Sequence, residues 1–219
     1  MTTAGHAEEV RRALVVAAHP DDVDFGAAGT VASWTKAGID VAYCIATSGE
    51  AASIEGMDRE QVARIRRQEQ LAAAAEVGVF DVTFLGHLDG RVECSLGLRR
   101  DIARVIRLLR PDRVLSWSPE INYAHVVTSH PDHRATGAAT LAAIYPDARN
   151  PLAHPELLAE EGLQPWTVAE LWLTDSPAAL RGHAVDVTDT FDAKLAALRA
   201  HRSQTGSMIT LEDTMREYL

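Results

Sequence analysis

Short apolar runs alternate with helix-like periodic segments along most of this chain. Runs of strand length occupy residues 13–18, 39–47, 79–85 and 113–117, and two later ones are 168–174 and 183–187. The intervening helical patterns cover 26–37, 58–77, 98–109, 130–144 and 191–198, the last with Thr188 or Asp189 as its cap. This alternation is typical of a parallel sheet with helices on both faces. We therefore predict an α/β, Rossmann-like fold with a mostly parallel sheet flanked by helices.

The length of 219 residues suits one domain with a sizeable core, so we predict a single domain over residues 1–219. The first eleven residues show no apolar pattern and are predicted to be a disordered N-terminus. Four prolines fall within residues 146–165, which predicts an irregular excursion over the surface. The tail beyond Ser203 receives no assignment.

Charge and cysteine content narrow the class of partner. Twenty-one basic against 31 acidic residues give a net charge of −10, which argues against nucleic acid or an anionic membrane as the partner. No apolar stretch reaches the length of a membrane span, and the first residues carry no signal-peptide pattern. Cys44 and Cys94 lack CxxC spacing and are predicted to be reduced thiols. These features favour a cytoplasmic protein that acts on a small molecule.

A cluster of candidate metal ligands follows the first predicted strand. His19, Asp21 and Asp22 stand in the segment AHPDD at the carboxyl end of that strand, the edge where open α/β sheets bind ligands. Imidazole and carboxylate groups are ligands for divalent ions. The alternative is that an aspartate only caps the next helix and His19 is an ordinary strand-end residue. No GxGxxG follows the strand, which removes a dinucleotide-binding interpretation of this loop.

A second cluster, His130-Pro131-Asp132-His133, follows the strand predicted at 113–117. Alone, such a segment is more often an exposed polar helix start than a binding site. Both clusters, however, lie beyond strand ends at the same edge of the predicted sheet. Together they supply three possible metal ligands and a further base, which are the groups that a metal-dependent hydrolase needs.

These motifs resemble those of the LmbE-like (PIG-L) N-deacetylases. The resemblance covers most of the chain from Arg12 to Gln204, and its core is the pairing of AHPDD with the distant HPDH. Further similar stretches are Val23 to Thr30, Thr47-Ser48-Gly49-Glu50, Arg66-Arg67-Gln68-Glu69, Leu88-Asp89-Gly90 and His201-Arg202-Ser203-Gln204.

The resemblance implies a zinc ion, with iron(II) or another divalent ion also compatible, held by His19, Asp22 and His133. It implies Asp21 as the general base for water and His130 as general acid or oxyanion stabiliser. Asp132 would orient a histidine, while Glu50, Arg66 and Asp89 would bind substrate. Ordinary structural roles remain open for the last three, such as a solvated helix position for Arg66 and a turn position for Asp89.

The implied activity is removal of an N-acyl group, usually acetyl, from an amino sugar or glycoside such as an N-acetylglucosaminide. One alternative is an amidase of the same family that acts on a larger thiol conjugate or natural-product amide, and another is a non-catalytic binding protein. Members that process mycothiol-type substrates carry Tyr where this chain has Thr128, and Tyr123 of the same loop is a candidate replacement. The resemblance also implies a homo-oligomer, for which Trp166 and Trp172 could lie between subunits or in the chain's own core.

Overall fold

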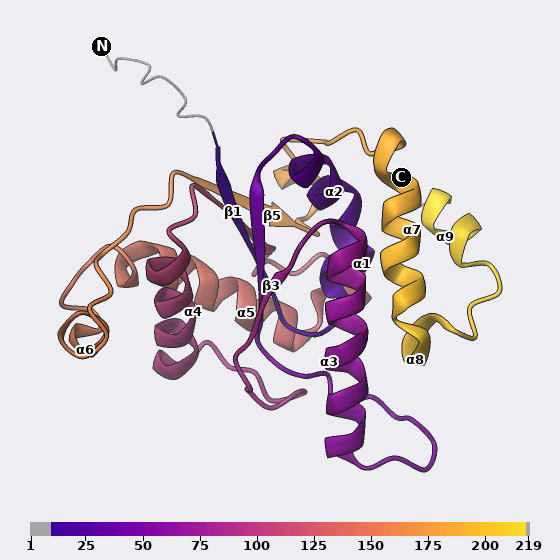
Figure 1. The fold of residues 1–219 in the computed structure, drawn as a ribbon, viewed down its shortest axis with the longest axis horizontal. Coiled ribbons are helices and arrows are strands. Elements are labelled where there is room, and N and C mark those ends of the chain that lie inside the picture. The colour runs from indigo at the N-terminus through magenta and orange to yellow at the C-terminus, as the bar shows by residue number, and fades with distance from the viewer. Residues whose placement is uncertain (1–9, 218–219) are drawn as a thin grey trace.

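A parallel sheet of five strands forms the centre of the protein in a computed structural model that describes residues 10–217 (Figure 1). The strand order is β3-β2-β1-β4-β5, and every pairing is parallel. The strands are β1 (Arg12–Ala17), β2 (Asp40–Ile45), β3 (Asp81–Phe84), β4 (Arg113–Trp117) and β5 (Glu170–Thr174). The predicted α/β fold is confirmed. Most of the N-terminal stretch predicted to be disordered, residues 1–9, lies outside the described residues.

The central strand is β1, which is hydrogen-bonded to β2 on one side and to β4 on the other. Ala13 lies opposite both Val41 and Arg113 in this register. Both faces of β1 are buried, which explains its continuous apolar run. Because the strands are parallel, the loops that follow β1, β2 and β4 all meet at one edge of the sheet.

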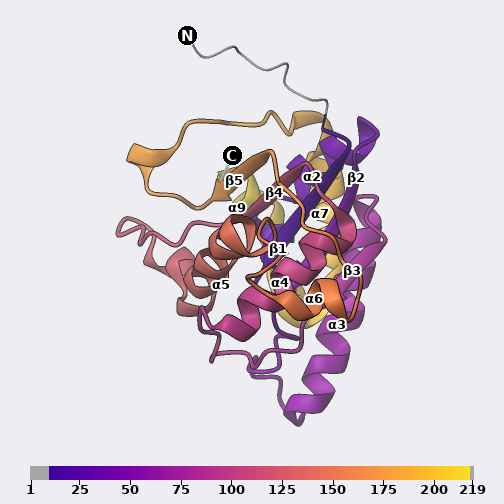
Figure 2. The same cartoon turned by 90° about the vertical axis from the view of Figure 1, so that its left-hand side faces the viewer.

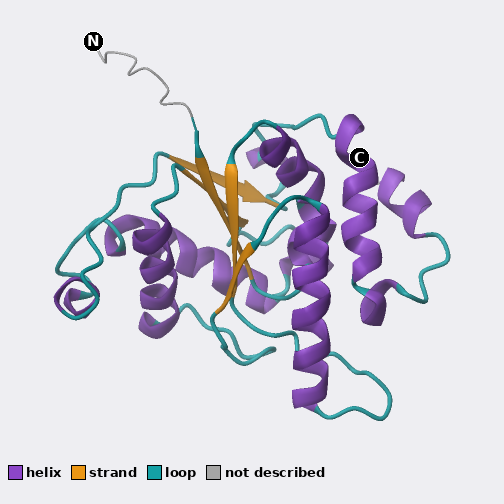
Figure 3. Ribbon diagram, viewed as in Figure 1, coloured by secondary structure: helices purple, strands orange, loops and turns teal. Residues whose placement is uncertain are grey.

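Helices cover both faces of the sheet, as Figures 1 and 3 show. The larger ones are α2 (Ala28–Lys36), α3 (Arg59–Glu76), α4 (Leu96–Leu109), α5 (Pro131–Ala142) and α7 (Phe191–Ala200). The shorter ones are α1 (Asp22–Gly26), α6 (Pro155–Ala159), α8 (Arg202–Thr205) and α9 (Leu211–Glu217). The helix predicted at 26–37 is therefore α2, preceded by the extra turn α1, which begins within the AHPDD segment.

Alternate residues of β1 enter two separate cores. Val15 packs with Trp34 of α2 and Ala74 of α3 on one face. Leu14 packs with Ile102 of α4 on the other face. Because successive side chains of a strand point to opposite faces, β1 packs against the helices on both sides of the sheet. A smaller cluster, formed by Phe191, Leu195, Leu198, Leu211 and Met215, joins α9 to α7.

The segment 183–187 is not a strand, so that part of the prediction is wrong. It belongs to the connection between β5 and α7, which extends away from the body of the protein before it returns (Figure 2). Its side chains find partners outside the sheet: the His183 ring lies 4.6 Å from Trp172, and Val187 lies against Gly29. The cap of α7 also differs from prediction, because Thr190 precedes the helix and donates its hydroxyl to the Gly29 carbonyl.

The excursion at 146–165 begins within a π-helical turn (Ala143–Asp147) and contains the short helix α6, but is otherwise irregular. Buried Arg107 of α4 anchors its start by donating to the backbone carbonyls of Asp147, Ala148 and Asn150. These bonds satisfy carbonyl groups that an irregular segment would otherwise leave unpaired.

The two tryptophans considered for a subunit interface both pack against their own chain. Trp166 donates its indole N–H to the Pro111 carbonyl, at 2.7 Å. Trp172 lies edge-on to Trp34, with 5.4 Å between ring centroids. Their presence therefore needs no partner subunit.

None of the helices within residues 10–217 combines the length and the apolar character that crossing a bilayer requires. Cys44 is buried and Cys94 is exposed, and both are free thiols, as predicted.

Candidate active site

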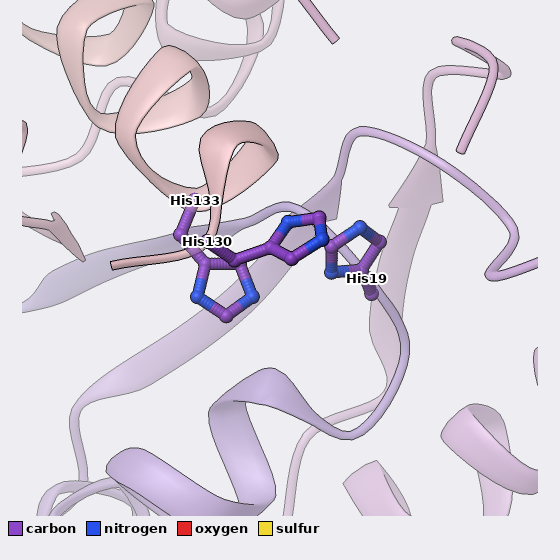
Figure 4. Close-up of side chains that lie close together, drawn as sticks. All are labelled: His19, His130 and His133. Atoms are coloured by element: carbon purple, nitrogen blue, oxygen red, sulfur yellow. The ribbon is translucent and has the colours of Figure 1, made fainter. Parts of the chain in front are cut away.

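The two predicted clusters meet at the carboxyl edge of the sheet. His19 comes from the loop after β1, whereas His130 and His133 come from the start of α5, beyond β4. Figure 4 shows the three imidazoles gathered together, and one ring nitrogen from each lies within 4.8 Å of the others. Residues more than 110 positions apart in sequence therefore form one site.

The His19 ring is oriented by two carboxylates. Its Nε2 atom lies 3.0 Å from Asp89 Oδ1 and 3.2 Å from Asp132 Oδ2. Because carboxylates only accept hydrogen bonds, Nε2 carries a proton, and Nδ1 is the nitrogen that remains for a metal ion. The Nδ1 atom lies 3.6 Å from Asp22 Oδ2.

In His133 the two ring nitrogens have exchanged partners. Its Nδ1 atom lies 3.1 Å from the Thr128 carbonyl, to which it donates. Its Nε2 atom lies 3.1 Å from Asp22 Oδ1. The indole of Trp117, at the end of β4, stacks on the ring with 4.1 Å between centroids and an angle of 8°. Thr128 and Trp117 thereby fix which nitrogen faces Asp22.

Asp22 joins the two histidines. Its Oδ2 atom accepts from the backbone N–H groups of Ala18 and His19 and from Trp117 Nε1. Its Oδ1 atom remains turned toward His133. Burial raises the pKa of Asp22, but its hydrogen bonds to His133 and His19 lower it well below the usual range, so the group is a carboxylate.

The donor set suits a divalent ion. Although burial lowers it, hydrogen bonds to Asp132, Asp22 and Asp89 raise the pKa of His19 to about 12. Burial also lowers the pKa of His133, but Asp22 raises it more. The carboxylates thus stabilise positive charge at this point. A bound divalent cation provides the same positive charge as two protonated histidines. Two imidazole nitrogens and one carboxylate oxygen are ligands that zinc and iron(II) both accept.

Asp21 adjoins this donor set and contacts buried Arg66. The distance from Arg66 Nη2 to Asp21 Oδ2 is 3.0 Å. Burial raises the pKa of Asp21 to about 6, with Arg66 opposing the rise and Asp22 adding to it. Arg66 also donates to the carbonyls of Pro20 and Gly49, so it ties the loops after β1 and β2 together.

His130 is the exposed member of the three histidines. The backbone N–H of Asp132 donates to its Nδ1 atom over 3.2 Å. Burial and the neighbouring His19 and His133 lower the pKa of His130. The neutral ring therefore carries its proton on Nε2, which is free to donate.

The residues assigned to substrate binding lie in the same region, and each also makes contacts within the protein. Glu50 accepts from the backbone N–H of Asp89 at 2.8 Å, and Asp89 accepts from that of Ala51 at 2.8 Å. Buried Asp89 faces His19, and Arg66 faces Asp21. Their contact with substrate stays a prediction. Tyr123, proposed to replace the tyrosine missing at Thr128, is 82% exposed.

Sequence reasoning missed Trp117 and Gln70. Trp117 is the last residue of a strand that was predicted with the right bounds, so its position at the binding edge was a usable signal. Gln70 lies on the buried face of α3 and contacts Asp21 and Asp24. Its position in an Ala-rich helix gave no such signal.

An α/β sheet with a buried His–Asp cluster at its carboxyl edge defines a class of protein equipped to bind a divalent ion and a small molecule. The family model described as "GlcNAc-PI de-N-acetylase" (PIG-L) matches residues 14–144, which include every residue of the cluster. This chain belongs to the PIG-L family, whose LmbE-like deacetylases its motifs resemble.

Named relatives agree with this assignment. A probable N-acetyl-α-D-glucosaminyl L-malate deacetylase 2 of Bacillus cereus is 34% identical over 93% of this chain and 87% of its own length. The diacetylchitobiose deacetylase of Thermococcus kodakarensis is 31% identical over 90% of this chain and 71% of its own. The structure of N,N'-diacetylchitobiose deacetylase from Pyrococcus horikoshii superposes with a TM-score of 0.86 at 29% identity, covering 96% of this chain and 77% of that one.

Proposed function

We propose that this protein is a zinc-dependent hydrolase that removes the N-acetyl group of an amino sugar or its glycoside, such as an N-acetylglucosaminide. The observation that carries the proposal is the buried cluster in which Asp22 lies against both His19 and His133, with the carboxylate of Asp21 next to it in the chain and paired with Arg66. The named relatives are deacetylases of diacetylchitobiose and N-acetylglucosaminyl malate, which indicates the substrate class.

His19, Asp22 and His133 would hold the ion. When bound, zinc lowers the pKa of water and polarises a carbonyl group, which is the chemistry that amide hydrolysis needs. Iron(II) would fit the same donor set. Asp132 and Asp89 hold the His19 tautomer that leaves Nδ1 available, an outer-shell role that histidine ligands commonly require.

Asp21 accepts the proton of the attacking water. A carboxylate whose pKa is raised by burial is a better base than an exposed aspartate, and its ion pair with Arg66 keeps it ionised and in place. Neutral His130 donates its Nε2–H as a hydrogen bond to the oxyanion, and Asp21 passes the proton that it took from water to the leaving nitrogen. Glu50, Arg66 and Asp89 would contact the hydroxyl groups of the sugar.

Turnover on a defined panel tests the proposal. The zinc-loaded protein is incubated with N-acetylglucosamine, N,N'-diacetylchitobiose and N-acetylglucosaminyl malate, and the free amine is measured. We expect amine release from at least one of them, with chelation of the metal removing it. No release from any substrate by protein of full zinc content would contradict the proposal and favour a binding protein.

A second candidate is an amidase for a larger substrate. A cavity of about 1310 Å³ is lined by Ser118, Asp175, Arg181 and Thr128, among others, and Thr128 connects it to His133; none of the proposed metal ligands lines it. It exceeds the usual 300–1,000 Å³ of small-ligand sites, so an amide with a bulky second half would fit. Faster turnover of such conjugates than of the sugars in the panel would favour this candidate.

We also propose a homo-oligomer, on the strength of the resemblance alone. Light scattering at working concentration should give a multiple of the 23.7 kDa chain mass. A mass of one chain would contradict it.

A further inference from the structure

The backbone of Asp21 adopts an uncommon conformation. Its φ of 83° lies in the left-handed region, which a residue with a side chain rarely occupies. Its backbone N–H donates to Gln70 Oε1 over 2.8 Å. Gln70 belongs to α3 and is 49 positions from Asp21 in the chain, so a distant helix holds the strained position. Such strain persists only where surrounding contacts enforce it.

The amide of Gln70 can take only one orientation. Its Nε2 atom lies 2.9 Å from Asp24 Oδ2, which as a carboxylate oxygen can only accept. The N–H of Asp21 can only donate. Oε1 must therefore face Asp21 and Nε2 must face Asp24. Gln70 is fully buried, so water does not compete for either bond.

The chain of contacts continues to the C-terminal part of the protein. Fully buried His201, between α7 and α8, lies with Nε2 at 2.8 Å from the same Asp24 oxygen. The same oxygen of Asp24 thus contacts both His201 and Gln70. The order His201, Asp24, Gln70, Asp21 connects the residue after α7 to the loop after β1.

Two further contacts brace the same elements. Lys194 of α7 donates its ammonium group to the carbonyls of Asp24 and Phe25 at the end of α1. Ser203 of α8 donates both its backbone N–H and its hydroxyl to Glu69 of α3, at 2.7 and 2.6 Å. The C-terminal segment therefore fixes α1 and α3, the two helices that hold Asp21.

We infer that Gln70 is a positioning residue for Asp21, and that His201 supports it through Asp24. Gln70 fixes the left-handed backbone, and this backbone sets where the carboxylate lies beside Arg66 and Asp22. The inference rests on the proposed role of Asp21 as general base. A purely structural contribution of Gln70 would change stability without a selective change in kcat.

The first test replaces Gln70 by Met, which has a similar length and no hydrogen-bonding amide. In Gln70→Met we expect kcat to fall by roughly 10–100-fold, because small displacements of a reacting group cost rates of this order. KM and zinc content should match the parent. Gln68→Met is the control, since Gln68 is exposed on the same helix. Parent kcat in folded Gln70→Met would overturn the inference.

The second test uses His201 and does not depend on Gln70→Met folding. Gln can place an N–H donor near the position of His Nε2, whereas Leu cannot. We expect His201→Leu to lose kcat and His201→Gln to recover most of it at parent zinc content. Equal kcat in the two variants would overturn the support through Asp24.

Crystal structures separate this inference from the proposed function. If the parent shows no amide hydrolysis, the proposed function fails, but the position of residue 21 in Gln70→Met can still be determined. We expect its φ to leave the left-handed region or its carboxylate to move away from the Arg66 guanidinium. An unchanged Asp21 in that structure would overturn the inference whatever the activity.

Discussion

Asp21→Asn is expected to lower kcat by roughly 10²–10⁴-fold, the usual contribution of a general base. Asparagine has the shape of aspartate, but its amide cannot accept the proton of water. Zinc content should stay at the parent level, because His19, Asp22 and His133 are unchanged. The loss should fall on kcat, since the proton is transferred in the transition state. Steady-state kinetics and metal analysis of the same preparation measure both quantities.

Asp40→Asn is a matched control, because Asp40 is exposed at the start of β2. Parent turnover in Asp21→Asn would show that another group takes the proton. Loss of zinc from that variant would instead show that Asp21 is a ligand and that Asp21 and Asp22 have exchanged roles.

Loss of any one proposed ligand is expected to lower zinc affinity by more than the 10–100-fold typical of outer-shell substitutions. The variants are His19→Ala, Asp22→Ala and His133→Ala. Each leaves only two of three ligands, and Asp22→Ala also removes the carboxylate that joins the histidines. Zinc per chain after dialysis against a weak chelator measures the effect, and turnover should fall with it.

His87→Ala is a suitable control, because His87 pairs with Asp101 and belongs to neither group of candidate metal ligands. Full zinc occupancy in all three ligand variants would contradict the assignment. Loss in only the histidine variants would point instead to the cluster of His19, His130 and His133, whose nitrogens also lie close together.

The strands were predicted well where the pattern reflects burial on both faces. The predicted bounds of β4 match the observed ones at both ends, and those of β1 differ by one residue at each end. The strand predicted at 183–187 failed because alternating apolar residues also suit a segment that packs on side chains. Val187 lies against Gly29 rather than in a ladder of hydrogen bonds. The pattern of apolar residues predicts which residues are buried, but it does not predict what they pack against.

The site was predictable to the extent that strand ends define it. AHPDD and HPDH each follow a strand, and parallel strands bring their carboxyl ends to one edge, so the approach of His19 to His133 was expected. The tautomers of the two histidines were not predictable. They depend on Asp89, Asp132 and the Thr128 carbonyl, which reach the rings from separate loops.

The sequence by itself determined the fold class, the edge that carries the site and the residue types present there, because these follow from local patterns and from chain order. Only the tertiary structure decided the left-handed backbone of Asp21, the stacking of Trp117 on His133 and the burial of Arg66 against Asp21. Each of these depends on contacts between elements far apart in the chain. Gln70 and His201 show the difference most clearly. Their side chains gain a role only when α3 and α7 pack beside the loop after β1, because a hydrogen bond is fixed by distance and direction in space.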